Sequence, residues 1–450
     1  MVQANRRRNL AAVRGTSLGR VLRSVSQSRQ CPARRSADNI TRGLVPPSVN
    51  QNNFMLRPRV IRCSSRSGLL FRHGVDRDAA PVGTRIEVKT FHCGVCQSLI
   101  FFENTQCLNC AAQLAYVPSE TALLALSEGR DGLWRTPVGS ALENHAYKLC
   151  INYRQRNVCN WALSSNDPES LCESCRLTHT IPRLDLSGSL EAWAKLETAK
   201  RRLLYAIITL RLPLVGKRQD AERGLEFQFL SDSTTDNGDR SRVLTGHDNG
   251  LITINVAEAD DAYREAQRQR QREPYRTLLG HFRHEIGHYY WDQLIQNSTR
   301  IEEYREIFGD ERADYQQALK VHYENGPPGD WGEHYISAYA STHPWEDWAE
   351  SWAHVLHMID ALETAQSLGL SVKPVRDDEP ALEIPASSVN ARVIDFDQLI
   401  RDWSALTYVL NNLTRGLGLA DAYPFVLSPT VVRKLKFVCD SMLTPATRAG

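Results

Sequence analysis

Apolar residues recur every three or four positions in several stretches after residue 185, and this spacing predicts long helices. The first helix should begin at Ser189, whose hydroxyl suits a helix N-cap. A second should follow Pro274 and reach about Gln296, and a third should start at Thr299, which with Glu302 fits a capping box. The buried face predicted for the first helix consists of Leu190, Trp193, Leu196, Leu203, Leu204 and Ile207.

A fourth helix should start near Pro344 and run past Ala361. Its large apolar side chains keep the same spacing, and such aromatic stripes usually pack in a core, so we favour packing over a ligand-binding role. After residues 375–388, which are typical of a linker or a long surface loop, helical spacing returns in residues 390–450. The stripe of the fourth helix is Trp345, Trp348, Trp352, Leu356 and Ile359, and that of the last segment is Leu399, Trp403, Leu406 and Leu410.

Two shorter runs predict strands, Leu225–Leu230 and Gly250–Val256, and the second is rich in β-branched residues. Between this second strand and the second helix lies Ala257–Arg272, which is so charged that its helix should be largely solvated. We expect the first acidic residues of this stretch at the surface, and these are Glu258, Asp260 and Asp261. Long helices together with a few strands predict the α+β class, with a mostly helical region that contains a small β-sheet.

Length and composition fit a globular protein of two or three domains, since the chain has 450 residues, of which 42% are apolar and 24% charged. The longest apolar run, around Leu203–Leu214, is interrupted by polar residues, which excludes an integral membrane protein. We divide the chain into an arm (residues 1–85), a cysteine-rich region (residues 86–185), a main folded region (residues 186–375) and a C-terminal helical segment that packs on it (residues 376–450).

The net charge of +2 hides an asymmetry in the first part of the chain. Residues 1–75 contain fifteen arginines, no lysine and a single acidic residue, Asp38. Such an arm could be a transit-type sequence or a nucleic-acid-binding tail, but we favour a disordered arm. It lacks the apolar stretch of a secretory signal, so we expect a cytoplasmic protein whose eleven cysteines are reduced.

Eight of the eleven cysteines fall between residues 93 and 175, and close cysteine pairs in a reducing compartment usually bind metal. The first four form the pattern Cys-x2-Cys-x10-Cys-x2-Cys, which is typical of a structural zinc held by four thiolates. The second four predict another zinc site, or otherwise one redox-inert pair and two buried thiols. The two sets are Cys93, Cys96, Cys107 and Cys110, and Cys150, Cys159, Cys172 and Cys175.

A small zinc-ribbon-like β module should surround the first set, since Val88, Phe91 and Ile100–Phe102 suit short strands. A unit of this size buries little core, so bound zinc would supply much of its folding free energy, on the order of 10 kcal/mol apparent. Ribbons that bind nucleic acid need basic residues, and Lys89 is the only lysine or arginine in residues 86–120, so we favour a scaffold or protein-docking role and expect nucleic-acid contact only at the arm. The remaining cysteines should be plain thiols, and these are Cys31, Cys63 and Cys439.

The strongest chemical signal is the run His284-Glu-Ile-Gly-His288 in the second predicted helix. Residues four apart lie on the same face of a helix, so the two imidazoles can bind one zinc ion. Glu285 lies beside them and could take the proton from a zinc-activated water that attacks a carbonyl. The run therefore predicts a hydrolytic zinc site.

A catalytic zinc site needs a third protein ligand and one open position. The metzincin continuation requires Gly at position 291 and His at position 294, where the chain has Trp291 and Leu294, so that class is excluded. A carboxylate from a later helix is the common alternative, and Asp292 could either support the site or lie at the surface. The candidate carboxylates are Glu302, Glu306, Asp310, Glu311, Asp314, Glu346, Asp347 and Glu350.

Glu346 and Glu350 lie four apart on the fourth predicted helix, where they could supply one ligand and one carboxylate that orients a histidine, or could form a solvated face. The run Tyr339-Ala-Ser-Thr-His-Pro-Trp-Glu346-Asp-Trp-Ala-Glu350 resembles a segment of the lethal-factor-type metalloproteases, with the same spacing from tyrosine to glutamate. By that resemblance, Glu346 is the third zinc ligand, Glu350 supports a ligand, and Tyr339 donates to the oxygen of the reacting carbonyl.

Several further motifs point to one family. They are Cys93-Gly-Val-Cys96, Cys107-Leu-Asn-Cys110, Cys159-Asn-Trp161, Cys172-Glu-Ser-Cys175-Arg-Leu-Thr, Gly250-Leu-Ile-Thr-Ile-Asn255, Arg283-His-Glu-Ile-Gly-His-Tyr-Tyr-Trp-Asp292, Phe308-Gly-Asp-Glu-Arg312 and Tyr423-Pro-Phe-Val-Leu427. On these motifs, most of residues 88–440 resembles the bacterial putative zinc-binding metallopeptidases that carry an N-terminal zinc-ribbon-like region. The resemblance implies a zincin-like catalytic domain in residues 186–375 and leaves the substrate open.

We therefore predict a zinc metallopeptidase with a glutamate as third ligand, one catalytic zinc, one or two structural zincs, and a peptide or protein substrate. If Leu251–Val256 forms a free sheet edge beside the zinc, an extended peptide could pair with it through main-chain hydrogen bonds. The alternative is a non-catalytic zinc-binding interaction or regulatory protein in which every zinc is structural. Zinc-dependent hydrolysis of a non-peptide amide would use the same residues.

Overall fold

The computed structural model describes residues 90–443, apart from residues 141, 143–144, 235–239, 272–275, 377, 384–388 and 391–392. The arginine-rich arm with Cys31 and Cys63, together with Val88 and Lys89, lies outside the described residues. The described residues belong to one compact unit, and their helices and small sheets confirm the α+β class. None of the described helices combines the length and the apolar character that crossing a membrane requires.

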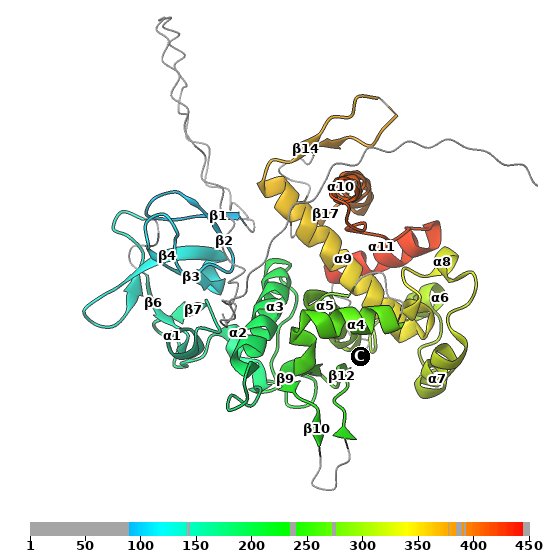
Figure 1. Ribbon diagram of the computed structural model, residues 1–450, viewed down its shortest axis with the longest axis horizontal. Helices are drawn as coiled ribbons and strands as arrows, with labels where there is room; N and C mark the ends of the chain where they lie inside the picture. Colours follow the sequence, from blue (N-terminus) through cyan, green and yellow to red (C-terminus); the bar gives the residue numbers. More distant parts are fainter. Residues whose placement is uncertain are drawn as a thin grey trace, which may run out of the picture. The chain divides into compact units, whose positions relative to one another are not determined.

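The elements follow one another from short strands to long helices (Figure 1). The strands are β1 (Thr90–His92), β2 (Leu99–Phe101), β3 (Gln113–Val117), β4 (Ala122–Glu128), β5 (Trp134–Arg135), β6 (Ala146–Leu149), β7 (Ala162–Ser164), β8 (Thr178–Thr180), β9 (Glu226–Leu230), β10 (Ser233–Thr234), β11 (Arg240–Ser241), β12 (Gly246–Asp248), β13 (Leu251–Asn255), β14 (Ser371–Val372), β15 (Leu382–Glu383), β16 (Val389–Asn390) and β17 (Val393–Ile394). The α-helices are α1 (Ile151–Arg156), α2 (Glu173–Arg176), α3 (Ser189–Thr209), α4 (Asp261–Gln271), α5 (Leu278–Leu294), α6 (Ile301–Phe308), α7 (Tyr315–Asn325), α8 (Trp331–His334), α9 (Pro344–Ser367), α10 (Phe396–Gly416) and α11 (Pro429–Leu443). Three short 3-10 helices are η1 (Pro118–Glu120), η2 (Val256–Ala259) and η3 (Tyr339–Ser341).

The cysteine-rich region is built from short antiparallel strands. β1 and β2 form a hairpin in which Phe91 pairs with Ile100, and both side chains are buried. A five-stranded sheet follows in the order β3-β4-β5-β6-β7. Its core is continuous with that of the helices, since the ring centroid of Tyr205 on α3 lies 5.8 Å from that of Tyr116 and 5.2 Å from that of Phe102.

A second sheet has the strand order β12-β13-β9-β8 and is antiparallel only between β12 and β13. Both predicted strands are present, as β9 and β13, but β13 is an inner strand, so the free edge at Leu251–Val256 that peptide pairing would require is not formed. A tight turn at Asn249 and Gly250, both with positive φ, folds β12 back onto β13. A β-carbon at Gly250 would lie 2.2 Å from the carbonyl oxygen of Gly224, which explains the glycine. The two edge strands of this sheet are therefore β12 and β8.

The predicted long helices are present, but two predicted caps are wrong. Gly188, with φ of 79°, occupies the N-cap of α3, so Ser189 is already helical, and Leu190 is 41% exposed instead of buried. α6 begins after Arg300 without a side-chain cap, because Glu302 pairs with Arg305 rather than with the helix N-terminus. The other residues predicted for the buried face of α3 are buried, and these are Trp193, Leu196, Leu203, Leu204 and Ile207.

The charged stretch before α5 differs from the prediction at one residue. Asp260 and Asp261 are exposed and no described residue of α4 is buried, as predicted for a solvated helix. Glu258 is buried, and its Oε1 accepts from the guanidinium of Arg276 at 3.1 Å. The prediction that Glu258 lies at the surface is therefore wrong, because an arginine outside the predicted helix satisfies its charge.

Helices α5 and α9 cross at close range, with α9 drawn in yellow beside α5 and α11 (Figure 1). Gly287 makes this approach possible, because a β-carbon there would lie 3.0 Å from Cα of Ala349 and 3.2 Å from Cβ of Trp352. The indole nitrogen of Trp348 donates to the carbonyl oxygen of Gly287 at 2.8 Å. Tyr290 stacks on Trp352 with ring centroids 4.7 Å apart. This packing fixes the register between the two helices.

The C-terminal helices close over α9. Leu399, Trp403 and Leu406 of α10 are buried, as their spacing predicts. Lys434 of α11 donates to Asp347 Oδ2 at 2.6 Å, and neither side chain is exposed by more than 5%. Burial raises the pKa of Asp347 to about 7. The start of α9 is therefore tied to α11 by a buried ion pair.

Candidate metal centres

Two helices bring three ligand atoms together. Nε2 of His284 lies 3.2 Å from Nε2 of His288, one turn further along α5. Oε2 of Glu346, in the first turn of α9, lies 3.0 Å and 3.5 Å from these two nitrogens. All three residues are largely buried, and Glu346 Oε2 accepts no hydrogen bond from any described residue.

The spacing of these atoms fits zinc. Zinc bonds of about 2.0–2.2 Å at tetrahedral angles separate ligand atoms by about 3.3–3.6 Å, close to the 3.0–3.5 Å observed here. Burial disfavours a charged imidazole at His284, yet Glu346 and Glu350 outweigh it and hold the pKa of His284 well above its usual range. Both the distances between the ligand atoms and the negative charge of the two carboxylates therefore favour a cation at this point.

Two of the three candidate ligands are oriented by hydrogen bonds to residues that lie outside the group of three. Nδ1 of His284 lies 2.7 Å from Oε1 of Glu350, whose other oxygen accepts from Ser337 Oγ at 2.6 Å. With its proton on Nδ1, His284 presents the lone pair of Nε2 to the centre. Tyr315, the first residue of α7, donates to Oε1 of Glu346 at 2.6 Å and leaves Oε2 facing the imidazoles. The sequence reasoning missed Tyr315, because it lies on a separate helix and no spacing rule connects it to the histidines.

Aromatic rings form one wall beside His288. The ring of Trp345 lies 4.0 Å from that of His288, and the ring of His247 on β12 stacks at 6.2 Å. Trp345 is only partly buried, so this first member of the α9 stripe packs against the centre, while the other four members lie in the core. Asp292 lies 3.9 Å from Nε2 of His247, and burial raises its pKa to about 6. Asp292 thus sits behind this ring wall and not among the three ligand atoms.

The two residues predicted to act on substrate lie next to the centre. Glu285 follows His284 on α5, and burial raises the pKa of its carboxyl above the usual range. Tyr339 of η3 has its ring 5.9 Å from the ring of His284, and burial raises the pKa of its phenol. Its phenol is therefore protonated and can donate a hydrogen bond.

The remaining candidate carboxylates are engaged elsewhere or exposed. Glu302 and Glu311 pair with Arg305, and Asp310 pairs with Arg312. Asp314 caps α7, Asp347 pairs with Lys434, and Glu306 is exposed. Among the described residues, Glu346 is the carboxylate that joins the two histidines.

The eight clustered cysteines form two four-sulfur groups. In the first, Cys93 Sγ lies 3.6 Å from Cys110 Sγ, and Cys96 Sγ lies 3.6 Å from Cys107 Sγ. Tetrahedral zinc with bonds of about 2.3 Å separates sulfurs by about 3.8 Å, whereas a disulfide joins them at about 2.05 Å. The geometry therefore fits a metal held by four thiolates and not two disulfides.

The second group is the more deeply enclosed of the two. All four sulfur ligands are buried, and Cys159 Sγ lies 3.7 Å from Cys172 Sγ. Contacts with Cys159 and the other thiols hold the pKa of Cys150 well below its usual range, while burial raises that of Cys159. Cys439 lies apart from both groups as a buried thiol.

Two family models match the chain in succession. The zinc-ribbon domain matches residues 90–186, which confirms the predicted ribbon region. A model described as putative zinc-binding metallo-peptidase matches residues 189–441, which contain His284, His288 and Glu346.

Relatives that are 41% identical over 352 residues occur in Mycobacterium bovis and in two strains of Mycobacterium tuberculosis. The match covers 78% of this chain and 94% of each relative, and all three are named as uncharacterized proteins. No solved structure gives a significant match to the chain. The similarity thus extends over both the ribbon region and the region that holds the site at His284, His288 and Glu346, which we call the open centre because three ligand atoms, and not four, meet there.

Proposed function

Since this chain belongs to the putative zinc-binding metallo-peptidase family, we propose that it hydrolyses peptide bonds in a peptide or protein substrate. The observation that carries the proposal is the convergence of His284, His288 and Glu346 on one point, with three ligand atoms where a closed site would have four. A three-ligand zinc site keeps one position for water or substrate.

Each residue around the centre has a role that follows from its contacts. Zinc at this point would lower the pKa of a water towards about 7 and polarise a substrate carbonyl. Glu285 would take the proton of the attacking water and pass it to the leaving amine. The hydroxyl of Tyr315 is engaged with Glu346, which leaves Tyr339 to donate to the oxygen that becomes negative.

The test is Glu285→Gln, assayed with zinc-loaded full-length protein on a random peptide library. Removing the base should lower turnover by about 10²–10⁴-fold while zinc content stays the same. Glu302→Gln on the exposed side of α6 is the matched control and should keep full activity. Unchanged turnover in Glu285→Gln would refute the role of Glu285.

A peptide hydroxamate separates this proposal from the alternative of a non-catalytic zinc protein. In the peptidase it should occupy the open position, displace no zinc and inhibit cleavage. A zinc protein with only closed sites should neither bind the hydroxamate nor cleave the library.

A further inference from the structure

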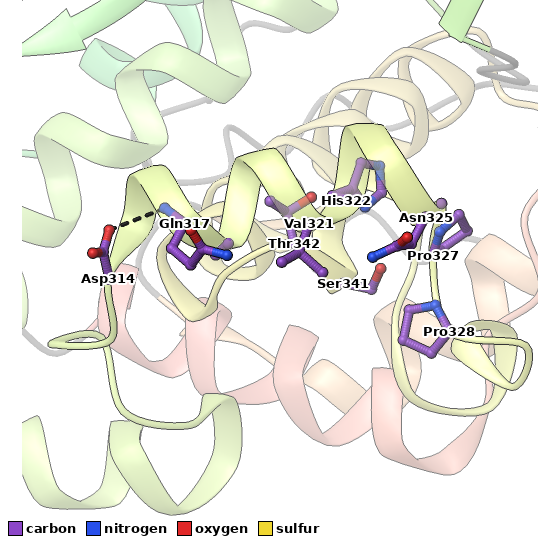
Figure 2. Close-up of a pocket in the computed structure, with 11 residues that line it drawn as sticks. Asp314, Gln317, Val321, His322, Asn325, Pro327, Pro328, Ser341 and Thr342 are labelled. Carbon is purple, nitrogen blue, oxygen red and sulfur yellow. Dashed lines mark hydrogen bonds between the residues drawn. The ribbon is translucent and has the colours of Figure 1, made fainter. Parts of the chain in front are cut away.

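A groove with a volume of about 620 Å³ runs along one face of α7. Its α7 wall carries Gln317, Val321 and Asn325 at helical spacing, and Ser341 and Thr342 belong to the opposite wall. Figure 2 shows Asp314 at one end of the groove and Pro327 and Pro328 at the other. The volume lies within the range of about 300–1,000 Å³ that is common for ligand sites.

Both walls of the groove belong to elements that also carry residues in contact with the metal centre. Tyr315, next to Asp314 on the α7 side, donates to the ligand Glu346. On the other side, Tyr339 begins the short helix η3 that ends at Ser341. The ring of His322 in the groove lies 6.1 Å from that of Tyr339, which itself lies 5.9 Å from that of His284. One aromatic ring thus separates the groove from a zinc ligand.

The groove is uncharged along most of its length. No lysine or arginine is found among the described residues that line it, and the charged residues Lys320 and Glu324 of α7 lie off this face. The carboxylate of Asp314 accepts from the N–H of Gln317 at 3.0 Å and so caps the helix. Val321 is 43% exposed in the middle of the groove. The lining therefore offers an apolar contact between amide and hydroxyl groups.

We propose that this groove binds a segment of the substrate on one side of the scissile bond and selects uncharged side chains there. Val321 contacts a substrate side chain, while the amides of Gln317 and Asn325 and the hydroxyls of Ser341 and Thr342 bind the substrate main chain. An acidic side chain would find no lysine or arginine in the groove, would face a His322 whose pKa burial lowers, and would meet Asp314. This proposal rests on the proposed peptidase function, since it assigns a substrate to the same centre.

The test introduces a charge into the groove and at a matched site. Val321→Lys places a cation in the groove, whereas Gln316→Lys places the same cation on an exposed position of α7 outside it. Zinc-loaded full-length proteins are incubated with a random decapeptide library, and cleavage positions are read by mass spectrometry. Val321→Lys should raise the frequency of Asp and Glu at one position near the cleaved bond by about fivefold, as one partly exposed ion pair allows. Gln316→Lys should keep the wild-type preference.

A binding measurement keeps the two proposals apart. Peptides from the same library are captured on immobilised Glu285→Gln protein and on its Val321→Lys double variant. If wild type cleaves the library but Val321→Lys and Gln316→Lys prefer the same residues near the cleaved bond, the groove assignment is wrong and the peptidase function stands. If nothing is cleaved but captured peptides change with Val321→Lys, the peptidase function fails, and of the groove assignment only peptide binding stands. Absence of both cleavage and capture overturns both.

Discussion

The two kinds of metal centre in this chain differ in how their ligands are assembled. The four-cysteine groups take their ligands from loops and from the short helices α1 and α2 or their caps, in a region of short strands. The His284, His288 and Glu346 centre takes its ligands from two long helices already packed through Gly287. We therefore expect bound metal to stabilise the fold in the first case, and the fold to position the metal in the second.

The two kinds of centre also differ in how many ligands they supply. Four sulfurs complete a tetrahedron and exclude solvent, which suits a structural role. Three ligands, two of them hydrogen-bonded to Glu350 and Tyr315, would instead leave one position for water or substrate. The comparison predicts that damage to a cysteine group reduces stability, while damage to the open centre reduces metal affinity and turnover at nearly constant stability.

The largest effect should come from Cys159→Ala. Losing one thiolate of the buried group should remove most of a folding contribution on the order of 10 kcal/mol apparent, so the ribbon region should unfold. Thermal unfolding and zinc content measure this. Cys439→Ala, a buried thiol outside both groups, is the control and should keep the full zinc content. Equal stability of the two variants would refute a structural metal at the second group.

Glu346→Ala should release the zinc of the open centre and keep the cysteine-bound zinc. Because it removes a ligand, the loss of affinity should exceed the roughly 10–100-fold that losing a supporting residue costs. Zinc content per chain should fall by one, with little change in circular dichroism. Should Asp310 or Asp314 prove necessary for zinc instead, the assignment of Glu346 would be wrong.

Tyr315→Phe sharpens the comparison, because it alters only the support of a ligand. Zinc affinity at the open centre should fall by about 10–100-fold, as measured by competition with a chelator, while the unfolding temperature stays close to wild type. Tyr408→Phe on the exposed side of α10 serves as control. A lower unfolding temperature with unchanged zinc affinity would assign Tyr315 to packing alone.

An effect of about the same size as that of Tyr315→Phe is expected from Gly287→Ala. The added methyl group would press on Ala349 and Trp352, and such overpacking typically costs about 1–3 kcal/mol. Since it moves α9 relative to α5, zinc affinity at the open centre should fall together with stability. Gly332→Ala, where a β-carbon meets no neighbour within 4 Å, should be neutral on both measures.

The sequence predicts this molecule best where a local rule applies. The α+β class, the long helices and two of the four strands of the second sheet follow from residue patterns, and the ribbon region follows from cysteine spacing. His284 and His288 are recognisable because both lie on one helix face. Roles at the open centre stay predictions, since the family matches name zinc binding and peptidase character without residue roles.

What the sequence could not predict depends on contacts between distant elements. Tyr315 on α7 donates a hydrogen bond to Glu346 on α9, and Glu258 is buried because Arg276 satisfies its charge. β13 is an inner strand because a turn at Gly250 adds β12 beside it. The N-cap predicted at Ser189 is wrong for a local reason. Gly188 occupies the N-cap of α3 in a left-handed conformation that favours glycine.

The ion pair between Asp347 and Lys434 has a consequence for synthesis on the ribosome. All three ligands of the open centre leave the exit tunnel well before Lys434, which belongs to the last described helix. Until then Asp347, the neighbour of Glu346, has no counterion, and an unpartnered buried charge costs about 3–5 kcal/mol. We therefore expect a nascent chain to hold the start of α9 weakly, and to complete the site at His284, His288 and Glu346 only after α11 has been synthesised and has packed.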